Sequence, residues 1–529
     1  MNLRKLTLTT LAALSAMTIW CGATFTDVPT GSALAEGVQK AQSYGLMNGY
    51  SDTVFGYGDS MTRGQFVTVL CRMMGWDYDQ EGAVPVAEDI TDSGFYASIV
   101  TAAQQDVWDM EDATFRPDDA ITRSEMCEML VRGLGLKSAA TSANKDLLFT
   151  DISGDTGYIS VAYAMGMTNG ISETTFAPDN TATRAQAATM LVRIYEKLQQ
   201  PMSTQGFYAI SSASQLPLTA TMDTIHFGWS RMTWDGATAL LSTVATGDNG
   251  NVFAVPGGYD DVVRALESKE RNLMVFMDTT DDVAGLLSDE QGRTQAVEQI
   301  IHELTVSYSA YGANPYTGVT IDFEGLRSGQ TADFNAFLTD LSAQVEALDK
   351  TLTVCVSPVL QTGTYYDGYD YKTIAGLADE ILLMAYNYDA TDLSGFETST
   401  YHQTAAPAPI DQVFWGLESL VSALDGQTES IVLGLSYKYI AWQIDSDGKL
   451  LSGTPVYPAL DTITARLAQE TTVHGWSDTY QTPYALYETE DGSRYFLWYE
   501  NQESMDAKTQ VAQLLGVDTL SLWRLGNIL

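Results

Sequence analysis

One short segment of the sequence carries two carboxylates at a spacing that suits acid–base chemistry. The segment runs from Gly318 to Glu324, and its apolar alternation predicts a β-strand. Side chains alternate across a strand, so Asp322 and Glu324 share one face with about 7 Å between their Cα atoms. Two ionised carboxylates this close repel each other, which raises the pKa of one of them. A carboxyl group with a raised pKa can act as a general acid near neutral pH.

The same pair also has a structural interpretation, in which Asp322 caps the next turn and Glu324 is a solvated residue at a rim. The surrounding elements decide between the two. Eight strand-like runs alternate with helical stretches, which predicts an α/β fold, a (β/α)8 TIM barrel. The runs are residues 207–211, 224–228, 273–277, 319–324, 352–357, 380–386, 431–435 and 519–523. Reactive groups of such barrels stand at the C-terminal ends of the strands, and Glu324 ends the fourth run.

A repeated pattern precedes this region. Thr-Arg-x-Glu/Gln begins at Thr62, Thr122 and Thr183, with a period of about 60 residues. Each Thr is expected to cap a helix, and the Glu or Gln three residues later to close a capping box. One unit is too small to bury a core alone, so we expect three α-rich units to pack together.

These units resemble the S-layer homology repeat, which has a Phe-x-Asp start, a Gly-rich turn and Thr-Arg-Ala-Glu. The starts are Phe25-Thr26-Asp27 and Phe149-Thr150-Asp151, whereas the second unit has only Asp89-Ile90-Thr91-Asp92. The resemblance covers residues 24–198 and implies non-covalent attachment to an anionic secondary polymer of the cell wall. Arginines at helix starts suit anion binding, so the expected polymer contacts are Arg63, Arg123 and Arg184. The alternative for each arginine is an ion pair with a loop carboxylate.

The barrel region resembles glycoside hydrolase family 18. The family signature Asp-Gly-x-Asp-x-Asp-x-Glu corresponds to residues 317–324, its Met-x-Tyr-Asp to residues 384–387, and its closing Trp strand to residues 521–526. Residues 483–487 are similar to a Pro-Tyr-x-x-Tyr stretch of the bacterial branch that contains spore-cortex-lytic and germination enzymes. Three positions depart from the family pattern, because the sequence has Thr317, Thr320 and Asn387 where the family has aspartates.

This resemblance implies a substrate-assisted retaining mechanism for sugars that carry an acetamido group. Glu324 would protonate the glycosidic oxygen, Asp322 would orient the acetamido group, and Tyr386 would hold its oxygen for attack. Thr320 can donate a hydrogen bond but carries no charge. The pKa of Asp322 must therefore be set differently from that of its counterpart in the family. The other expected substrate contacts are Met384, Asn387 and Trp523. Trp442 is added because the seventh run continues from Leu433 through Tyr439 to Trp442 and is expected to line the cleft.

Composition restricts the partners. The sequence has 27 Lys and Arg against 67 Asp and Glu, a net charge of −40, which argues against nucleic acid because phosphate binding needs a basic surface. Its 28 Tyr and 10 Trp suit sugars, whose rings stack on aromatic faces. The scattered cysteines and the four histidines indicate neither a disulfide framework nor a metal site, and no cofactor is implied.

The first residues predict export. A basic start and an apolar run that ends near Cys21 are typical of a secretory signal peptide, here residues 1–23. An uncleaved anchor helix is the alternative, although the run is short for a membrane span. No later segment reads as a transmembrane helix, so we expect the mature protein at the cell wall or cell surface.

The expected order is the signal peptide, S-layer homology repeats at residues 24–82, 83–143 and 144–199, and a barrel at residues 205–529 with a small α+β insertion near residues 445–500. The expected function is cleavage of β-1,4 bonds at N-acetylglucosamine in peptidoglycan. A chitinase is the first alternative. A catalytically silent, lectin-like protein and a purely structural surface-layer protein are the others.

Overall fold

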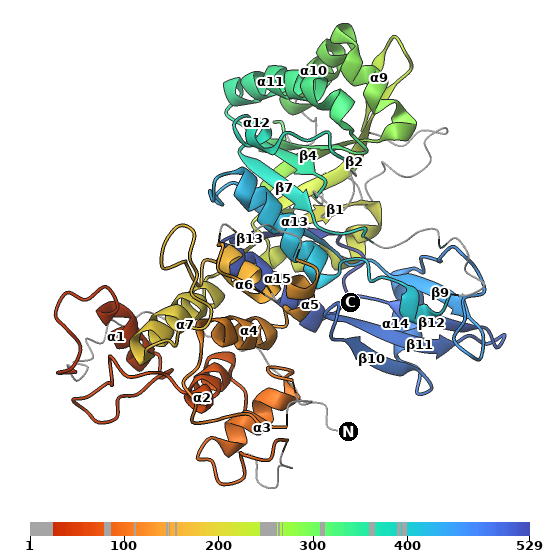
Figure 1. Cartoon of the computed structure of the whole chain (residues 1–529). Coiled ribbons are helices and arrows are strands. Elements are labelled where there is room, and N and C mark those ends of the chain that lie inside the picture. The colour runs from red at the N-terminus through yellow and green to blue at the C-terminus, as the bar shows by residue number, and fades with distance from the viewer. Residues whose placement is uncertain are drawn as a thin grey trace.

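The structure is a computed structural model, and it describes residues 25–78, 86–109, 113–143, 147, 149–153, 156–243, 262, 265–266, 268–306, 313–358, 366–388, 393 and 399–529. The predicted signal peptide lies outside the described residues. Figure 1 shows a helical N-terminal region, a barrel and a separate small sheet. Among the described helices, none is both long and apolar enough to cross a bilayer.

The N-terminal region consists of three helical units. Their helices are α1 (Ala35–Ser43), α2 (Arg63–Met74), α3 (Tyr96–Gln104), α4 (Arg123–Gly133), α5 (Lys137–Thr141), α6 (Gly157–Ala164) and α7 (Arg184–Leu198). The three predicted capping boxes are present, since Thr62, Thr122 and Thr183 each accept a hydrogen bond from the backbone three residues later. The local sequence therefore sets where α2, α4 and α7 begin.

The second unit folds like the other two although its sequence signature is weak. Asp27, Asp89 and Asp151 occupy equivalent positions, and each accepts backbone N–H groups from the turn 25–30 residues later, at 2.7–2.9 Å. Hydrogen bonds of this kind stabilise the ionised carboxylate, and the pKa values of Asp27 and Asp151 are lowered. For Asp27 these bonds outweigh the raising effect of burial, and for Asp151 the N–H of Phe176 is the largest cause.

The three units close into a ring. Helix α2 packs against α3 of the second unit, α4 against α6 of the third, and α7 of the third against α1 of the first. The last of these contacts is close, because a Cβ atom on Gly37 of α1 would lie 2.3 Å from Oγ1 of Thr189 on α7. Every unit thus contacts both of the others.

The second region is a closed barrel of eight parallel strands, which confirms the predicted TIM-barrel fold. In spatial order they are β1 (Ser203–Tyr208), β13 (Thr519–Trp523), β8 (Ile431–Ser436), β7 (Glu380–Met384), β6 (Thr351–Val356), β5 (Gly318–Phe323), β4 (Glu270–Met277) and β2 (Thr224–Trp234), and pairing of β1 with β2 closes the ring. Each strand coincides with one of the eight predicted runs or overlaps it.

Helices surround the barrel, as Figure 1 shows. They are α9 (Val283–Ser288), α10 (Glu290–Thr305), α11 (Thr331–Ala347), α12 (Tyr371–Ala375), α13 (Ile410–Ala423) and α15 (Gln502–Leu515), with the short 3-10 segments η1 (Ile210–Thr221), η2 (Thr279–Asp281), η3 (Ser328–Gln330) and η5 (Tyr401–Gln403). Strand β3 (Ala239–Ser242) pairs antiparallel with the end of β2 and contacts α10.

A small α+β insertion stands between β8 and α15. It contains β9 (Ile440–Ile444), α14 (Leu460–Leu467), β10 (Val473–Ser477), β11 (Thr482–Glu488) and β12 (Arg494–Trp498), in the antiparallel order β10-β11-β12-β9. The element type matches the prediction, but the insertion begins five residues earlier than expected. The run that follows β8 belongs to the insertion sheet and not to a barrel strand.

The repeat ring packs directly on the barrel. Helix α5 contacts α13, and α7 contacts α15. The indole Nε1 of Trp415 donates to the carbonyl of Ala139 at 2.9 Å, and Nζ of Lys197 donates to the carbonyl of Leu514 at 2.6 Å. The Trp415 bond is buried and the Lys197 bond is partly buried, and both connect the ring to the barrel.

Candidate active site

The two carboxylates of the sequence motif stand at the C-terminal end of β5. Asp322 lies on the strand, and Glu324 directly follows it, with its backbone N–H donating to the carbonyl of Met277 at the end of β4. Gly325 then adopts φ +80°, and a Cβ atom there would lie 2.7 Å from the Thr279 side chain. Glycine at this position therefore lets the chain turn sharply away and leaves Glu324 at the strand end.

The Glu324 side chain lines a cavity of about 580 Å³, called the catalytic pocket below. Its walls come from the ends of β5, β6 and β7 and from the start of α13. Several predicted site residues line it together with residues not foreseen, among them Glu324, Met384, Tyr386, Asn387, Asp411 and Tyr480. The barrel thus brings together residues that are about 160 positions apart in the sequence.

Asp322 is buried beside this cavity. Its side chain is 3% exposed, and its Oδ1 has no hydrogen-bond partner among the described residues. Burial, followed by the charge of Glu324, raises the pKa of Asp322 well above its ordinary value. A buried carboxyl oxygen without a partner is costly, so a polar group of a ligand would stabilise it.

The pKa of Glu324 is also raised. Burial is the larger cause, and the negative charge of Asp278 is the second. Sequence reasoning attributed the tuning of this pair to mutual repulsion, whereas removal from water is the leading cause for both groups. A raised pKa at the wall of this cavity is the property that a general acid needs.

Asp278 was missed by sequence reasoning. It follows β4, the neighbour of β5, and its carboxylate accepts from Thr280 and from Nη2 of Arg231. Burial favours the neutral form of Asp278, but these bonds outweigh it and lower the pKa. Asp278 is therefore ionised near neutral pH and acts on Glu324 as a fixed negative charge.

We expect Asp278→Asn to shift the pH dependence of catalysis. Removal of the negative charge lowers the pKa of Glu324, so the general acid loses its proton at lower pH. The alkaline limb of the kcat/KM profile should move toward acid. Asp281→Asn is the matched control, because Asp281 binds the same Arg231 but is not among the groups whose charge raises the pKa of Glu324. Equal profiles for wild type and Asp278→Asn would contradict this role.

Tyr386 remains a hydrogen-bond donor at this site. Burial, then the charge of Asp322, raises the pKa of its phenol well above the ordinary value, so the group stays protonated. Tyr369 contributes from the side, since its hydroxyl donates to the carbonyl of Phe323 at 2.7 Å. That bond fixes the end of β5 directly before Glu324.

Thr320, which replaces a family aspartate, is held by a buried histidine. Nδ1 of His226 lies 2.7 Å from Oγ1 of Thr320, and Nε2 lies 2.8 Å from Oε1 of Gln205. Gln205 donates its amide to Glu380 at 2.7 Å, so its carbonyl oxygen must accept from Nε2 of His226. Nδ1 then accepts the Thr320 proton, and burial, which lowers the pKa of His226 to about 3, keeps the ring neutral.

The remaining predicted contacts differ in their placement. Asn387 lines the catalytic pocket, and its Oδ1 accepts from Nζ of Lys438 at 2.9 Å. Trp523 ends β13 half-buried, with its ring 5.1 Å from that of Phe207. Trp442 is not among the residues that line the pocket. It lies on β9 and is 1% exposed, because its side chain packs in the core of the insertion with Phe496 and Trp498. The prediction of Trp442 as a substrate contact is therefore not supported by its position.

The three helix-start arginines stand at separate junctions of the ring. Each donates its Nε–H to a phenylalanine carbonyl of the next unit and lies over that ring, in the pairs Arg63–Phe115, Arg123–Phe176 and Arg184–Phe55. The third pair returns to the first unit. Each arginine therefore also stabilises the packing between two units.

The electrostatic surroundings of the arginines are unequal. Nη1 of Arg63 forms a 2.6 Å ion pair with Glu125, a residue that also binds Arg116. The equivalent position is Gln65 in the first unit and Gln186 in the third. Among the ion pairs of the described residues, none includes Arg123 or Arg184, whose Nη2 atoms donate to the carbonyls of Asn169 and Asn48.

Comparisons with known proteins agree with both regions. Residues 240–527 match the family model described as glycosyl hydrolases family 18. Residues 24–67 and 148–188 match the S-layer homology domain, within the first and third units. The solved structures that resemble this chain include the spore cortex-lytic enzyme SleL of Bacillus cereus, with TM-score 0.47, 15% identity and coverage of 62% of this chain and 71% of that one.

Two further relatives extend the comparison. The cortical fragment-lytic enzyme of Bacillus subtilis (strain 168) is 22% identical over 287 residues, which cover 53% of this chain and 62% of that protein. A family 18 chitinase from Cycas revoluta in complex with (GlcNAc)3 has TM-score 0.48 and 19% identity, with coverage of 61% of this chain and 95% of that one. The match thus spans less than two thirds of the length of the curated relative.

Proposed function

The chain belongs to family 18 of the glycosyl hydrolases, and from this premise we propose that it cleaves β-1,4 bonds at N-acetylglucosamine in peptidoglycan while attached to the cell wall. It is a glycosidase, and its S-layer homology segments indicate anchoring at the cell surface. The bond, the mechanism, export and the wall polymer are the parts that we propose.

The observation that carries the proposal is the state of Asp322. Its buried Oδ1 lacks a partner among the described residues, next to Glu324 at the end of β5. The N–H of a sugar acetamido group is a donor of the kind that this oxygen needs, and it would remove the cost of the unpaired atom. The pocket is therefore suited to a 2-acetamido sugar.

We propose the following mechanism for these residues. Protonated Glu324 donates its proton to the glycosidic oxygen as the bond to the anomeric carbon breaks. The acetamido oxygen of the same sugar attacks that carbon and forms an oxazolinium ring, with Asp322 beside the acetamido N–H and the Tyr386 hydroxyl donating to its oxygen. Water then opens the ring, its proton passes to Glu324, and the configuration at the anomeric carbon is retained.

Selective removal of acetyl groups tests this mechanism. Purified full-length protein is incubated with peptidoglycan, with the same peptidoglycan after chemical de-N-acetylation, and with chitin oligosaccharides. We expect new reducing ends from intact peptidoglycan and none after de-N-acetylation. Cleavage of both forms at equal rates would refute the acetamido mechanism. Cleavage of chitin oligosaccharides alone would assign the chitinase alternative.

For wall attachment, we propose that the arginines differ in importance. Glu125 already neutralises Arg63, whereas Arg123 and Arg184 have no carboxylate in an ion pair among the described residues. An anionic wall polymer should therefore bind near Arg123 and Arg184 more strongly than near Arg63.

We accordingly expect Arg123→Gln and Arg184→Gln each to reduce co-sedimentation of the full chain with purified cell walls several-fold, while Arg63→Gln reduces it less. Thermal unfolding of each variant separates lost binding from lost packing, because all three arginines also hold neighbouring units. Co-sedimentation of all three variants at the wild-type level would show that the arginines are not part of the binding site.

A further inference from the structure

Helix α13 has the catalytic pocket on one side and the repeat ring on the other, and Figure 1 shows it next to α5. Its first turn lines the catalytic pocket with Asp411 and Gln412. The hydroxyl of Tyr388, another residue of the pocket wall, donates to the carbonyl of Gln412 at 3.4 Å. A Cβ atom on Gly416 would lie 2.9 Å from that hydroxyl. Glycine at this position therefore lets α13 pack directly against the pocket wall.

The other side of α13 is held by the repeat ring. Trp415 is 3% exposed, and its Nε1 donates to the carbonyl of Ala139 on α5. Helix α5 is held in turn by the third unit, since a Cβ atom on Gly157 at the start of α6 would lie 1.9 Å from the carbonyl oxygen of Ala140. Helix α6, helix α5, helix α13 and the pocket wall are thus in contact one after the other. Close-packed layers leave little free volume, so a shift of one layer moves the next.

A hydroxyl group of the repeat ring also reaches the catalytic pocket. Ser142 directly follows α5, and its side chain hydrogen-bonds the carboxylate of Asp411. Asp411 is half-buried in the first turn of α13. Burial raises the pKa of Asp411, and the N–H of Gln412 and the hydroxyl of Ser142 oppose this rise by donating to the carboxylate. Ser142 therefore fixes the direction in which a carboxylate of the pocket wall points.

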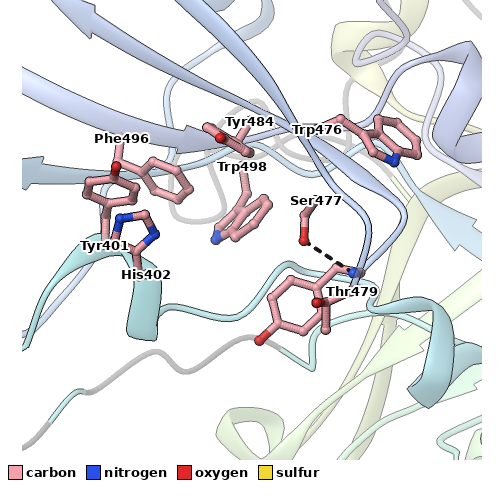
Figure 2. Close-up of a pocket in the computed structure, with 9 residues that line it drawn as sticks. Tyr401, His402, Trp476, Ser477, Thr479, Tyr484, Phe496 and Trp498 are labelled. Carbon is pink, nitrogen blue, oxygen red and sulfur yellow. Dashed lines mark hydrogen bonds between the residues drawn. The ribbon is translucent and has the colours of Figure 1, made fainter. Parts of the chain in front are cut away.

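The turn between β10 and β11 gives a second connection. Tyr480 of this turn lines the catalytic pocket, and Figure 2 shows the bond by which Oγ of Ser477 accepts from its N–H at 3.3 Å. The carbonyl of Tyr480 accepts from the N–H of Ile410 at 3.2 Å, which attaches the turn to the start of α13. A Cβ atom on Gly135 of the ring would lie 3.2 Å from Oε1 of Gln481 in the same turn. The ring therefore contacts both elements that form this side of the pocket.

We propose that the repeat ring is part of the active site as well as an anchor: Asp411 contacts a sugar of the bound glycan, and Trp415 and Ser142 are its positioning residues. A carboxylate accepts several hydrogen bonds, so it suits the hydroxyl groups of a sugar. A shifted wall would weaken substrate binding but leave the acid at Glu324 in place. The ring should therefore influence the cleavage of soluble glycans, which need no attachment to a wall. This role needs only the glycosidase activity, whichever glycan is cleaved.

Steady-state kinetics of the full chain on soluble substrates test the role of Ser142. The substrates are N-acetylglucosamine hexamers and soluble glycan strands prepared from peptidoglycan. Ser142→Ala should raise KM about fivefold, the effect of one lost hydrogen bond, with kcat close to that of wild type. Ser142→Thr keeps the hydroxyl group and should restore KM. Ser138→Ala is the matched control, because Ser138 also lies on α5 but its Oγ has no hydrogen-bond partner among the described residues, so KM should not change.

Further variants separate positioning from general damage. Asp411→Ala should raise KM, and the added change Ser142→Ala should raise it no further, because both changes remove the same contact. Trp415→Phe keeps an aromatic side chain but removes the donor to Ala139, so KM should rise here as well. Trp108→Phe is its control, since the buried Nε1 of Trp108 has no hydrogen-bond partner in the part of the chain that the structure describes. Thermal unfolding confirms that each variant is folded.

An unchanged KM in both Ser142→Ala and Trp415→Phe would overturn the inference, and the ring would then be an anchor alone. So would a rise of KM in Ser142→Ala that Ser138→Ala shows equally, or effects of Ser142→Ala and Asp411→Ala that simply add. A KM for N-acetylglucosamine hexamers that depends on Ser142, in a protein that does not cleave peptidoglycan strands, would refute the proposed function and leave the role of the ring standing.

Discussion

Replacement of Glu324 by Gln should leave a folded protein that cleaves glycan about 10³-fold more slowly than wild type. The amide keeps the size of the side chain but cannot give up a proton to the leaving oxygen, and general acid catalysis contributes about 10²–10⁴-fold. Release of reducing ends from peptidoglycan and from chitin oligosaccharides gives the rate. Substrate affinity should change far less than kcat.

Glu490→Gln is the control for this change, because Glu490 lies exposed in the turn between β11 and β12. Activity of Glu324→Gln within tenfold of wild type would show that another group supplies the proton. The cleavage reaction would then need a different acid in the catalytic pocket, and Asp411, whose pKa burial raises, would be the next residue to replace.

Loss of one buried charge should produce the largest loss of stability. Nζ of Lys508 on α15 lies 2.7 Å from Oε2 of Glu500, which follows β12, and the two side chains are 1% and 0% exposed. Ser504 donates to the same carboxylate oxygen at 2.6 Å. Lys508→Met leaves Glu500 charged, buried and without its cation, which costs about 3–5 kcal/mol.

Scanning calorimetry of the full chain measures this loss as a lower transition temperature for the barrel. The double change Lys508→Met with Glu500→Leu should regain much of the stability, since no unpaired charge remains. Lys372→Met is the control: its pair with Asp425 has the same 2.7 Å length but is exposed, so little change is expected. A double variant less stable than Lys508→Met would contradict the unpaired-charge explanation.

Local features were predictable from the sequence. The capping boxes at Thr62, Thr122 and Thr183 depend on residues three positions apart, and the barrel strands depend on short apolar runs. Both signals lie within one element, so a single sequence contains them. The second repeat was also found, although its start at Asp89 departs from the Phe-x-Asp pattern, because Thr122 keeps the period of about 60 residues.

What the sequence could not provide is the pairing of distant elements. Asp278 acts on Glu324 because parallel pairing places the end of β4 beside the end of β5. The bond between His226 and Thr320 joins residues 94 positions apart. Trp442 was assigned to the cleft because its run follows β8 closely, yet a strand has two faces, and the face of Trp442 is covered by the insertion's own core.

The closed ring of repeats limits how this S-layer homology region can change in size. The arginine of the third unit contacts Phe55 of the first, so the series has no free end to which a fourth unit could be added. An open array gains or loses copies one at a time, and its adhesion changes in steps. Here loss of one unit would expose two unmatched junctions at once, which makes attachment a property of the complete trio and not of the number of copies.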